Sequence, residues 1–253
     1  MNPIEQFYEK AYQIRFSELN AKGYLKPVKI FDYFQDIASE HTHHIGISAL
    51  DLFVKNLTWV VIRYHVKIFH YPKWNQPIII QTLRNTHKKL YELREFTVLD
   101  SDGTVLIQGR SVWVMLNTQS WKLVRLDRNL PNHLLTVNEV IDPEFMNISK
   151  LSQVDIRRNF YVRKDDLDVN QHVNNAVYIK WAIETIPDDI FQQCDLSEIN
   201  VQFLNDSYEQ EQISSMTQCI EHKEKIYVFR HSIQRNHDEK ELSHIETRWC
   251  VFG

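Results

Sequence analysis

The order of predicted elements runs twice along the chain, and this repeat restricts the fold more than any other feature of the sequence. Each half reads as a short strand, a polar loop, a hydrophobic helix and about four further strands. The strand, loop and helix align without gaps, pairing Arg163 with Arg15 (163 − 15 = 148), Leu167 with Leu19 and Trp181 with Tyr33. Further on, Val201 and Phe203 align with Val66 and Ile68 at a separation of 135, because the first half has a longer loop after its helix. Such internal similarity indicates two copies of one structural unit.

The elements themselves follow from hydrophobic period and from turn residues. In the first half we expect strands at 10–16, 57–69, 77–86, 91–99 and 104–117, and a helix at 27–45. Pro27 suits a first helical turn, Gly46 suits a helix end, and Asp102-Gly103 predicts a hairpin. In the second half we expect strands at 160–163, 199–204, 211–221, 225–234 and 241–252, and a helix at 173–186 that ends before Pro187.

A long helix and an antiparallel sheet that must bury one face form a natural layered unit. A helix wrapped by such a sheet is the hot-dog arrangement, so the chain of 253 residues predicts an α+β double hot dog. Joining the two sheets edge to edge would protect edge strands that each half alone would expose. We expect an N-terminal repeat at 1–130, a linker at 131–155 and a C-terminal repeat at 156–253.

Composition and charge narrow the classes of function. The formal net charge is -4 and the pI is about 6.3, which argues against general nucleic-acid binding. The three widely spaced cysteines, Cys194, Cys219 and Cys250, fit reduced thiols in the cytoplasm better than a disulfide framework or a zinc site. The apolar runs are too short to span a membrane, and the N-terminus lacks the pattern of a signal peptide. We expect neither a cofactor nor a metal.

The loop that enters the second helix carries three side chains suited to catalysis. Asp168, Asn170 and His172 alternate, which places them on one side of an extended segment. Asn174 or Asn175 then provides a cap for the hydrophobic helix that follows. The corresponding residues of the first half are Asn20, Lys22 and Tyr24 (separation 148), so the chemistry is expected in the second half alone.

At this point the residues resemble a known family. The string Asp168-Val-Asn-Gln-His-Val-Asn-Asn-Ala-Val-Tyr-Ile-Lys-Trp181 is similar to the signature of acyl-acyl-carrier-protein (acyl-ACP) thioesterases of plants and bacteria. Three other stretches also resemble that family: Asn56-Leu-Thr-Trp-Val-Val-Ile-Arg63, Tyr71-Pro-Lys-Trp74 and Ser111-Val-Trp-Val-Met-Leu-Asn117. The resemblance implies a double hot-dog fold and hydrolysis of the thioester between a fatty acyl chain and acyl carrier protein, within fatty acid biosynthesis.

The resemblance also implies roles for individual residues. Asp168, Asn170 and His172 would be catalytic, and the acidic residue and cysteine of the family correspond to Asp206 and Ser207. His172 can move a proton near neutral pH, and Asn170 would donate to the thioester oxygen. Asp206 would activate water directly or orient it together with His172. Asp168 would orient the loop or the amide of Asn170. Serine in place of cysteine puts a thiol nucleophile in doubt, and Asp206 and Ser207 also fit an ordinary turn.

Two further sets of residues are candidates for contacts with the substrate. Apolar residues of the first helix and the strand after it are candidates for the acyl cavity: Phe31, Phe34, Ile37, Trp59 and Val61. Basic residues near the catalytic loop are candidates for docking the acidic carrier protein: Arg157, Arg158, Arg163 and Lys164. A double hot dog is a pseudo-dimer, so both a monomer and a homodimer are open.

Three other functions stay open on the sequence. The first is hydrolysis of acyl-coenzyme A esters by the same fold. The second is a hot-dog dehydratase, which would also use a histidine and an acid but fits the Asp-Val-Asn-Gln-His string less well. The third is a non-catalytic module that binds or senses acyl groups.

Overall fold

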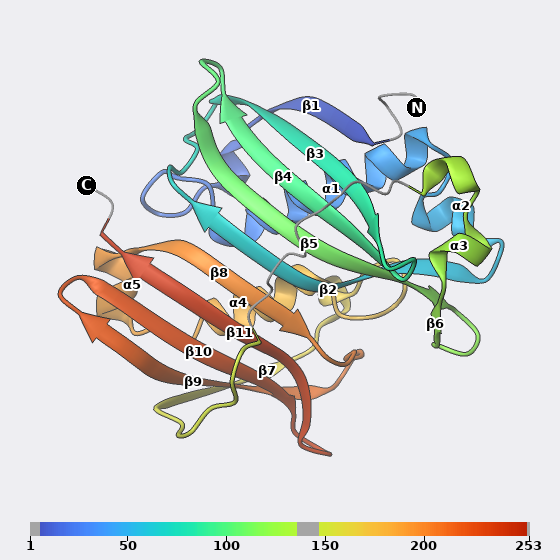
Figure 1. The fold of residues 1–253 in the computed structure, drawn as a ribbon. Helices are drawn as coiled ribbons and strands as arrows, with labels where there is room; N and C mark the ends of the chain where they lie inside the picture. The colour runs from blue at the N-terminus through green and yellow to red at the C-terminus, as the bar shows by residue number, and fades with distance from the viewer. Residues whose placement is uncertain (1–5, 136–146, 252–253) are drawn as a thin grey trace. The chain divides into compact units, whose positions relative to one another are not determined.

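The computed structural model describes residues 6–135 and 147–251, and the chain divides into two compact units, Met1–Phe145 and Met146–Gly253. Each unit combines an antiparallel sheet with a helix that lies along one of its faces (Figure 1). The chain is therefore an α+β double hot dog, as the repeated pattern predicts. Within the described ranges, every helix is too short or too polar to cross a membrane.

The N-terminal unit contains a sheet of five long strands in the order β1-β3-β4-β5-β2. These strands are β1 (Phe7–Gln13), β2 (Leu57–Ile68), β3 (Pro77–His87), β4 (Tyr91–Asp100) and β5 (Val105–Asn117). The two-residue strand β6 (Leu123–Val124) pairs with β5. The helices are α1 (Pro27–His44), α2 (Ala49–Phe53) and α3 (Leu126–Asn129), with 3-10 turns at Phe16–Glu18 and Asn132–Leu134.

The C-terminal unit repeats this plan with strands in the order β8-β11-β10-β9-β7. They are β7 (Ile156–Tyr161), β8 (Asp195–Phe203), β9 (Gln212–Lys223), β10 (Ile226–Arg235) and β11 (Lys240–Cys250). The helices are α4 (Asn175–Ile183) and α5 (Asp188–Gln193), and a 3-10 turn spans Lys164–Asp166.

Aromatic contacts seat each helix on its sheet. In the N-terminal unit, Phe34 of α1 stacks on Phe96 of β4 with ring centroids 4.3 Å apart. Gly109 of β5 pairs with Phe96 and leaves room for this stack, because a Cβ there would lie 2.3 Å from Cε2 of Phe34. In the C-terminal unit, Trp181 of α4 stacks on Phe160 of β7 at 5.9 Å. Burial of these large side chains supplies much of the hydrophobic stabilisation of each unit.

The structure corrects several predicted elements. The second helix covers 175–183 rather than 173–186, because Val173 pairs with Leu167 in a β-bridge and Asn174 caps the helix. The first strands of the two units end earlier than predicted, since Arg15 and Arg163 each precede a 3-10 turn. Helices α2 and α5 have too few turns to show a period.

Three leucines between residues 126 and 134 belong to the core of the N-terminal unit. Leu126, Leu130 and Leu134 are buried against Ile47 and Met115 in one cluster. The predicted linker begins at residue 131, whereas Leu134 of the 3-10 turn at Asn132–Leu134 packs with the N-terminal unit.

Candidate active site

A tight loop between β7 and α4 holds the three polar residues that the sequence singled out. The bridge between Leu167 and Val173 closes the loop, and the backbone N–H of Asp168 donates to the carbonyl oxygen of His172 at 2.7 Å. Inside it, Oδ1 of Asp168 accepts from the backbone N–H of Asn170 at 2.8 Å and of His172 at 3.2 Å. The carboxylate of Asp168 therefore orders the loop from within, by the geometry of an Asx turn.

The N-terminal unit contains the same loop with different side chains. Oδ1 of Asn20 accepts from the backbone N–H groups of Lys22 at 3.0 Å and Tyr24 at 3.1 Å. The backbone N–H of Asn20 donates to the carbonyl oxygen of Tyr24 at 2.8 Å. Every one of these bonds has its partner in the C-terminal unit at a separation of 148, so a neutral amide performs the same ordering as the carboxylate of Asp168.

A second segment, after β8, brings Asp206 to the loop. Oδ2 of Asp206 lies 3.8 Å from Nδ1 of His172, close enough for a charge interaction when the imidazole is protonated. The ring of Tyr208 meets the imidazole edge to face with centroids 5.0 Å apart. The backbone N–H of Val173 donates to the carbonyl oxygen of Ser207 at 3.0 Å and ties the two segments together.

The hydroxyl of Ser207 points into the protein. It donates to Oε2 of Glu211 at 2.7 Å, and Ser207 is fully buried. The same carboxylate oxygen accepts from the backbone N–H of Tyr208 at 3.0 Å. Glu211 is held in turn by Arg235, with 3.1 Å between Nη1 and Oε1. Ser207 is thus part of a turn that Glu211 anchors, which disfavours attack by its hydroxyl on a substrate.

Two tyrosines beside this turn stay protonated at neutral pH. Burial raises the pKa of Tyr178, and the negative charges of Asp206 and Glu211 raise it further. Burial also raises the pKa of Tyr208, with a further contribution from Asp206. Both hydroxyls can therefore donate a hydrogen bond where they meet an acceptor.

Sequence reasoning missed the neighbours Tyr208 and Glu211, although the repeat holds a signal for Glu211. Glu211 corresponds to Gln76 (211 − 76 = 135), whose Oε1 accepts from the backbone N–H of Lys73 at 2.9 Å. Comparing the two halves beyond the helix therefore pairs two side chains, Gln76 and Glu211, that both end in an oxygen acceptor.

The candidates for the acyl cavity lie in the interior of the N-terminal unit. Phe31 meets Tyr64 edge to face at 5.2 Å, and Phe34 stacks on Phe96. Ile37 and Val61 are buried. The indole N–H of Trp59 donates to the carbonyl oxygen of Ile47 at 2.9 Å, beside the leucine cluster.

The four basic candidates for docking are exposed on or near β7. Nη2 of Arg157 donates to Sδ of Met216 at 3.1 Å, and Arg163 and Lys164 flank the 3-10 turn. The turn itself contains Asp165 and Asp166, which offset the positive charge there.

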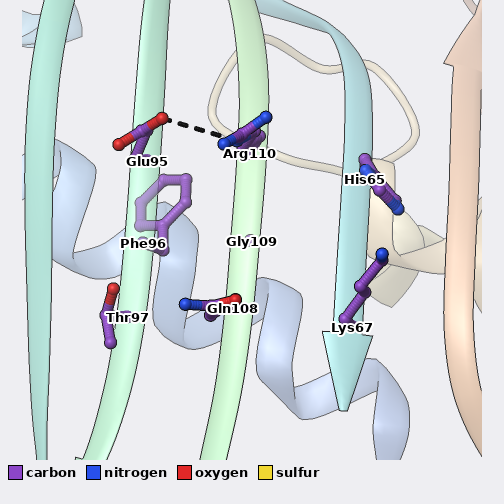
Figure 2. A pocket seen from close by; sticks show the side chains of 8 residues that line it. All are labelled: His65, Lys67, Glu95, Phe96, Thr97, Gln108, Gly109 and Arg110. Atoms are coloured by element: carbon purple, nitrogen blue, oxygen red, sulfur yellow. Dashed lines mark ion pairs between the residues drawn. The ribbon is translucent and has the colours of Figure 1, made fainter. Parts of the chain in front are cut away.

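A polar hollow lies on the face of the N-terminal sheet that points away from α1 (Figure 2). It is lined by His65, Lys67, Glu95, Phe96, Thr97, Gln108, Gly109 and Arg110. Nε of Arg110 and Oε1 of Glu95 lie 3.4 Å apart in it. The hollow combines charges of both signs and does not reproduce the histidine–aspartate geometry of the loop.

The fold and the loop define a double hot-dog protein with one histidine-bearing loop and one counterpart without histidine. A family model for the N-terminal domain of acyl-ACP thioesterases matches residues 5–133, and one for the C-terminal domain matches residues 148–250. The chain therefore belongs to the acyl-ACP thioesterase family.

Individual relatives agree with this assignment. A chloroplastic palmitoyl-acyl carrier protein thioesterase of Arabidopsis thaliana is 29% identical over 83% of this chain and 54% of its own length. The 12:0-ACP thioesterase of Umbellularia californica has a similar structure, with a TM-score of 0.85 and 25% identity over 98% of this chain and 99% of that chain. An acyl-ACP thioesterase of Bacteroides thetaiotaomicron shares the fold, with a TM-score of 0.83 and 19% identity over 98% and 100%. The chain spans about half the length of the curated relatives that it matches first, 54% in each case.

Proposed function

We propose that this chain hydrolyses the thioester of fatty acyl-ACP, releasing a free fatty acid and the carrier protein. The observation that carries the proposal is the approach of His172 to Asp206, at 3.8 Å, inside a loop that Asp168 orders. The corresponding N-terminal loop has Tyr24 and Tyr71 at these positions (172 − 24 = 148; 206 − 71 = 135), with ring centroids 6.3 Å apart. Of these two described loops, the C-terminal one thus pairs an imidazole, which can accept or donate a proton, with a carboxylate.

The proposed reaction is attack by water on the thioester carbonyl. His172 takes the proton of the attacking water, which it orients together with Asp206, so that a hydroxide equivalent adds to the carbonyl carbon. The amide of Asn170 and the positive end of the α4 dipole stabilise the negative charge on the carbonyl oxygen. When the tetrahedral intermediate collapses, the carbon–sulfur bond breaks and the proton passes to the departing thiolate. Direct attack by water is supported by the buried hydroxyl of Ser207, which Glu211 engages.

We place the acyl chain in the N-terminal unit, against the apolar residues around Phe31, Phe34 and Ile37. Support for this placement is their burial on α1 and the apolar character of their side chains. We also place the protein in the cytoplasm, because no disulfide joins Cys194, Cys219 and Cys250.

The test is hydrolysis of a panel of acyl-ACP substrates of varied chain length, with matched acyl-coenzyme A esters. We expect faster turnover of the carrier-protein substrates, with a preferred chain length. Equal or better turnover of the coenzyme A esters would move the function to a general acyl thioesterase. Tight binding of acyl ligands without turnover of either series would contradict catalysis and favour a non-catalytic acyl-binding module.

A further inference from the structure

One end of the N-terminal unit combines exposed apolar side chains with an excess of positive charge. We call it the basic end; it consists of α2 with Val54 and Lys55, the β3–β4 turn, the β5–β6 turn with Leu123, and α3 with Arg125. Backbone hydrogen bonds join its parts: Thr118 N–H donates to the carbonyl oxygen of Asn56 at 2.8 Å, and Leu126 N–H to that of Lys89 at 2.9 Å. Figure 1 shows α2, α3 and β6 gathered at this end.

The basic end also exposes large apolar side chains, and we call this group its apolar centre. Helix α2 buries Leu52 but leaves Leu50, Phe53 and Val54 at relative exposures of 76%, 62% and 82%. Trp121 and Leu123 of the neighbouring turn are exposed as well. Large apolar side chains exposed side by side cost solvation free energy and typically mark an interaction surface.

Cations lie in every part of the basic end. Six basic residues of the basic end are exposed: Lys55, Lys88, Lys89, Lys122, Arg125 and Arg128. The basic end contains two acidic residues, Asp51 and Asp127. Its local net charge is therefore +4 (6 − 2), in a chain whose net charge is -4. The carboxylate of Asp51 accepts a hydrogen bond from the hydroxyl of Ser48, and that of Asp127 accepts one from the guanidinium of Arg125. The local net charge is thus opposite in sign to the net charge of the whole chain.

We propose that the basic end docks the acidic carrier protein, an inference that rests on the proposed function. Protein–protein interfaces combine exposed apolar side chains with charged ones, and the positive charge of the basic end complements an acidic partner. The four basic residues predicted from the sequence around β7 form a less consistent surface, because Asp165 and Asp166 lie among them. The basic end has both more cations and an apolar centre.

The experiment measures binding and turnover separately. The docking variant is Lys55→Glu with Lys122→Glu and Arg128→Glu, which leaves the contacts of Asp51 and Asp127 in place. The control is Lys22→Glu with Lys67→Glu and Lys73→Glu, which makes the same change in net charge at exposed lysines elsewhere in the N-terminal unit. Phe53→Ser tests the apolar centre. The probes are a purified carrier protein bearing phosphopantetheine without an acyl chain, and vesicles of phosphatidylglycerol and phosphatidylcholine.

The proposal expects the docking variant to bind the carrier protein about tenfold more weakly, or worse, with a reduced dependence on salt. Phe53→Ser should also weaken binding, while the control stays within about twofold of the wild type. KM for acyl-ACP should rise, and kcat/KM for a hydrolysed acyl-coenzyme A ester should not change.

Several results would overturn docking at the basic end. The first such result is unchanged carrier-protein binding by the docking variant. The second is a docking variant that loses only vesicle binding, since that would assign the surface to a lipid bilayer. An equal loss in the control would show only a general effect of charge. If the wild type binds the carrier protein through the basic end but hydrolyses no thioester, docking stands and the proposed catalysis fails. If hydrolysis of acyl-ACP is normal in the docking variant, catalysis stands and docking fails.

Discussion

At the scale of single residues, His172 is the group on which proposed catalysis depends most directly. Replacing it by alanine removes proton transfer, so kcat should fall by about 10²- to 10⁴-fold. Its imidazole meets Tyr208 and Asp206 near the surface of the unit, so the fold should persist. Turnover of the preferred acyl-ACP together with far-UV circular dichroism checks both points. Unchanged kcat would remove His172 from the mechanism.

Asp168 allows a test that the chain itself suggests. Asn20 makes the corresponding backbone contacts with a neutral amide, so Asp168→Asn should preserve the loop. We expect kcat to fall less than about tenfold in Asp168→Asn and at least about 100-fold in Asp168→Ala, which loses the ordering bonds. If the asparagine variant is as inactive as the alanine variant, the negative charge is required and Asp168 does more than position the loop.

Ser207 separates attack by water from a covalent mechanism. Because its hydroxyl donates to Glu211, Ser207→Ala should keep kcat within about threefold and lower the free energy of unfolding by about 1–2 kcal/mol. Steady-state kinetics and urea unfolding measure the two effects. Loss of turnover in a variant that keeps its stability would favour a serine nucleophile instead.

At the scale of elements, the contact between α1 and its sheet depends on a glycine. Gly109→Ala would place a methyl group 2.3 Å from Cε2 of Phe34, whose ring is buried and stacked on Phe96. The ring has little room to move, so we expect a loss of about 1–3 kcal/mol in the free energy of unfolding. Denaturant titration checks this value. The double variant Gly109→Ala with Phe34→Leu should recover part of the loss, and no recovery would place the strain elsewhere.

The repeat explains which elements could be predicted from the sequence. Strong periods and punctuating residues identified α1 from Pro27 and the four long strands that follow it. The start of α4 also follows the repeat, because Asn175 corresponds to Pro27 (175 − 27 = 148). Helices α2 and α5 depend on tertiary packing and have five and six residues, too few for a period to emerge.

The proposed site also contains residues that a local sequence pattern indicates and residues that only the tertiary structure brings together. Alternating polar residues within one loop pointed to Asp168, Asn170 and His172. The approach of Asp206 to His172 was suggested by resemblance, and no local pattern could give it, because it depends on the return of β8 to the loop. Gln171 illustrates a further limit: its φ of 62° matches the φ of 80° at Gly23, yet a glutamine gives no turn signal.

At the scale of the whole molecule, the two units use one backbone plan for different purposes. The loops share their hydrogen bonds, whereas their side chains differ: Tyr24 and Tyr71 in one unit, His172 and Asp206 in the other. After duplication and divergence, the N-terminal copy would not need to keep catalytic residues. Its interior is then available to the acyl chain and its basic end to the carrier protein, as proposed above.

Global stability should decrease in acid because of a histidine in the core of the C-terminal unit. Burial lowers the pKa of His231 to about 3, and its ring meets the hydroxyls of Thr217 at 2.7 Å and Thr247 at 2.9 Å. In the unfolded chain the pKa is near 6.5, so between these values the unfolded state binds more protons. The contribution of neutral His231 is therefore complete above about pH 6.5 and decreases by about 1.4 kcal/mol per pH unit as the pH falls.

Urea unfolding between pH 7 and pH 5 measures this dependence. His231→Gln should lower stability at pH 7 because it disturbs the threonine contacts, but its stability should fall less steeply with pH than that of the wild type. The exposed residue His237 gives the control, and His237→Gln should retain the wild-type slope. Identical slopes in the wild type and His231→Gln would show that other groups govern the loss of stability in acid. Because the comparison is one of slopes, the result stands even if the substitution weakens the core at every pH.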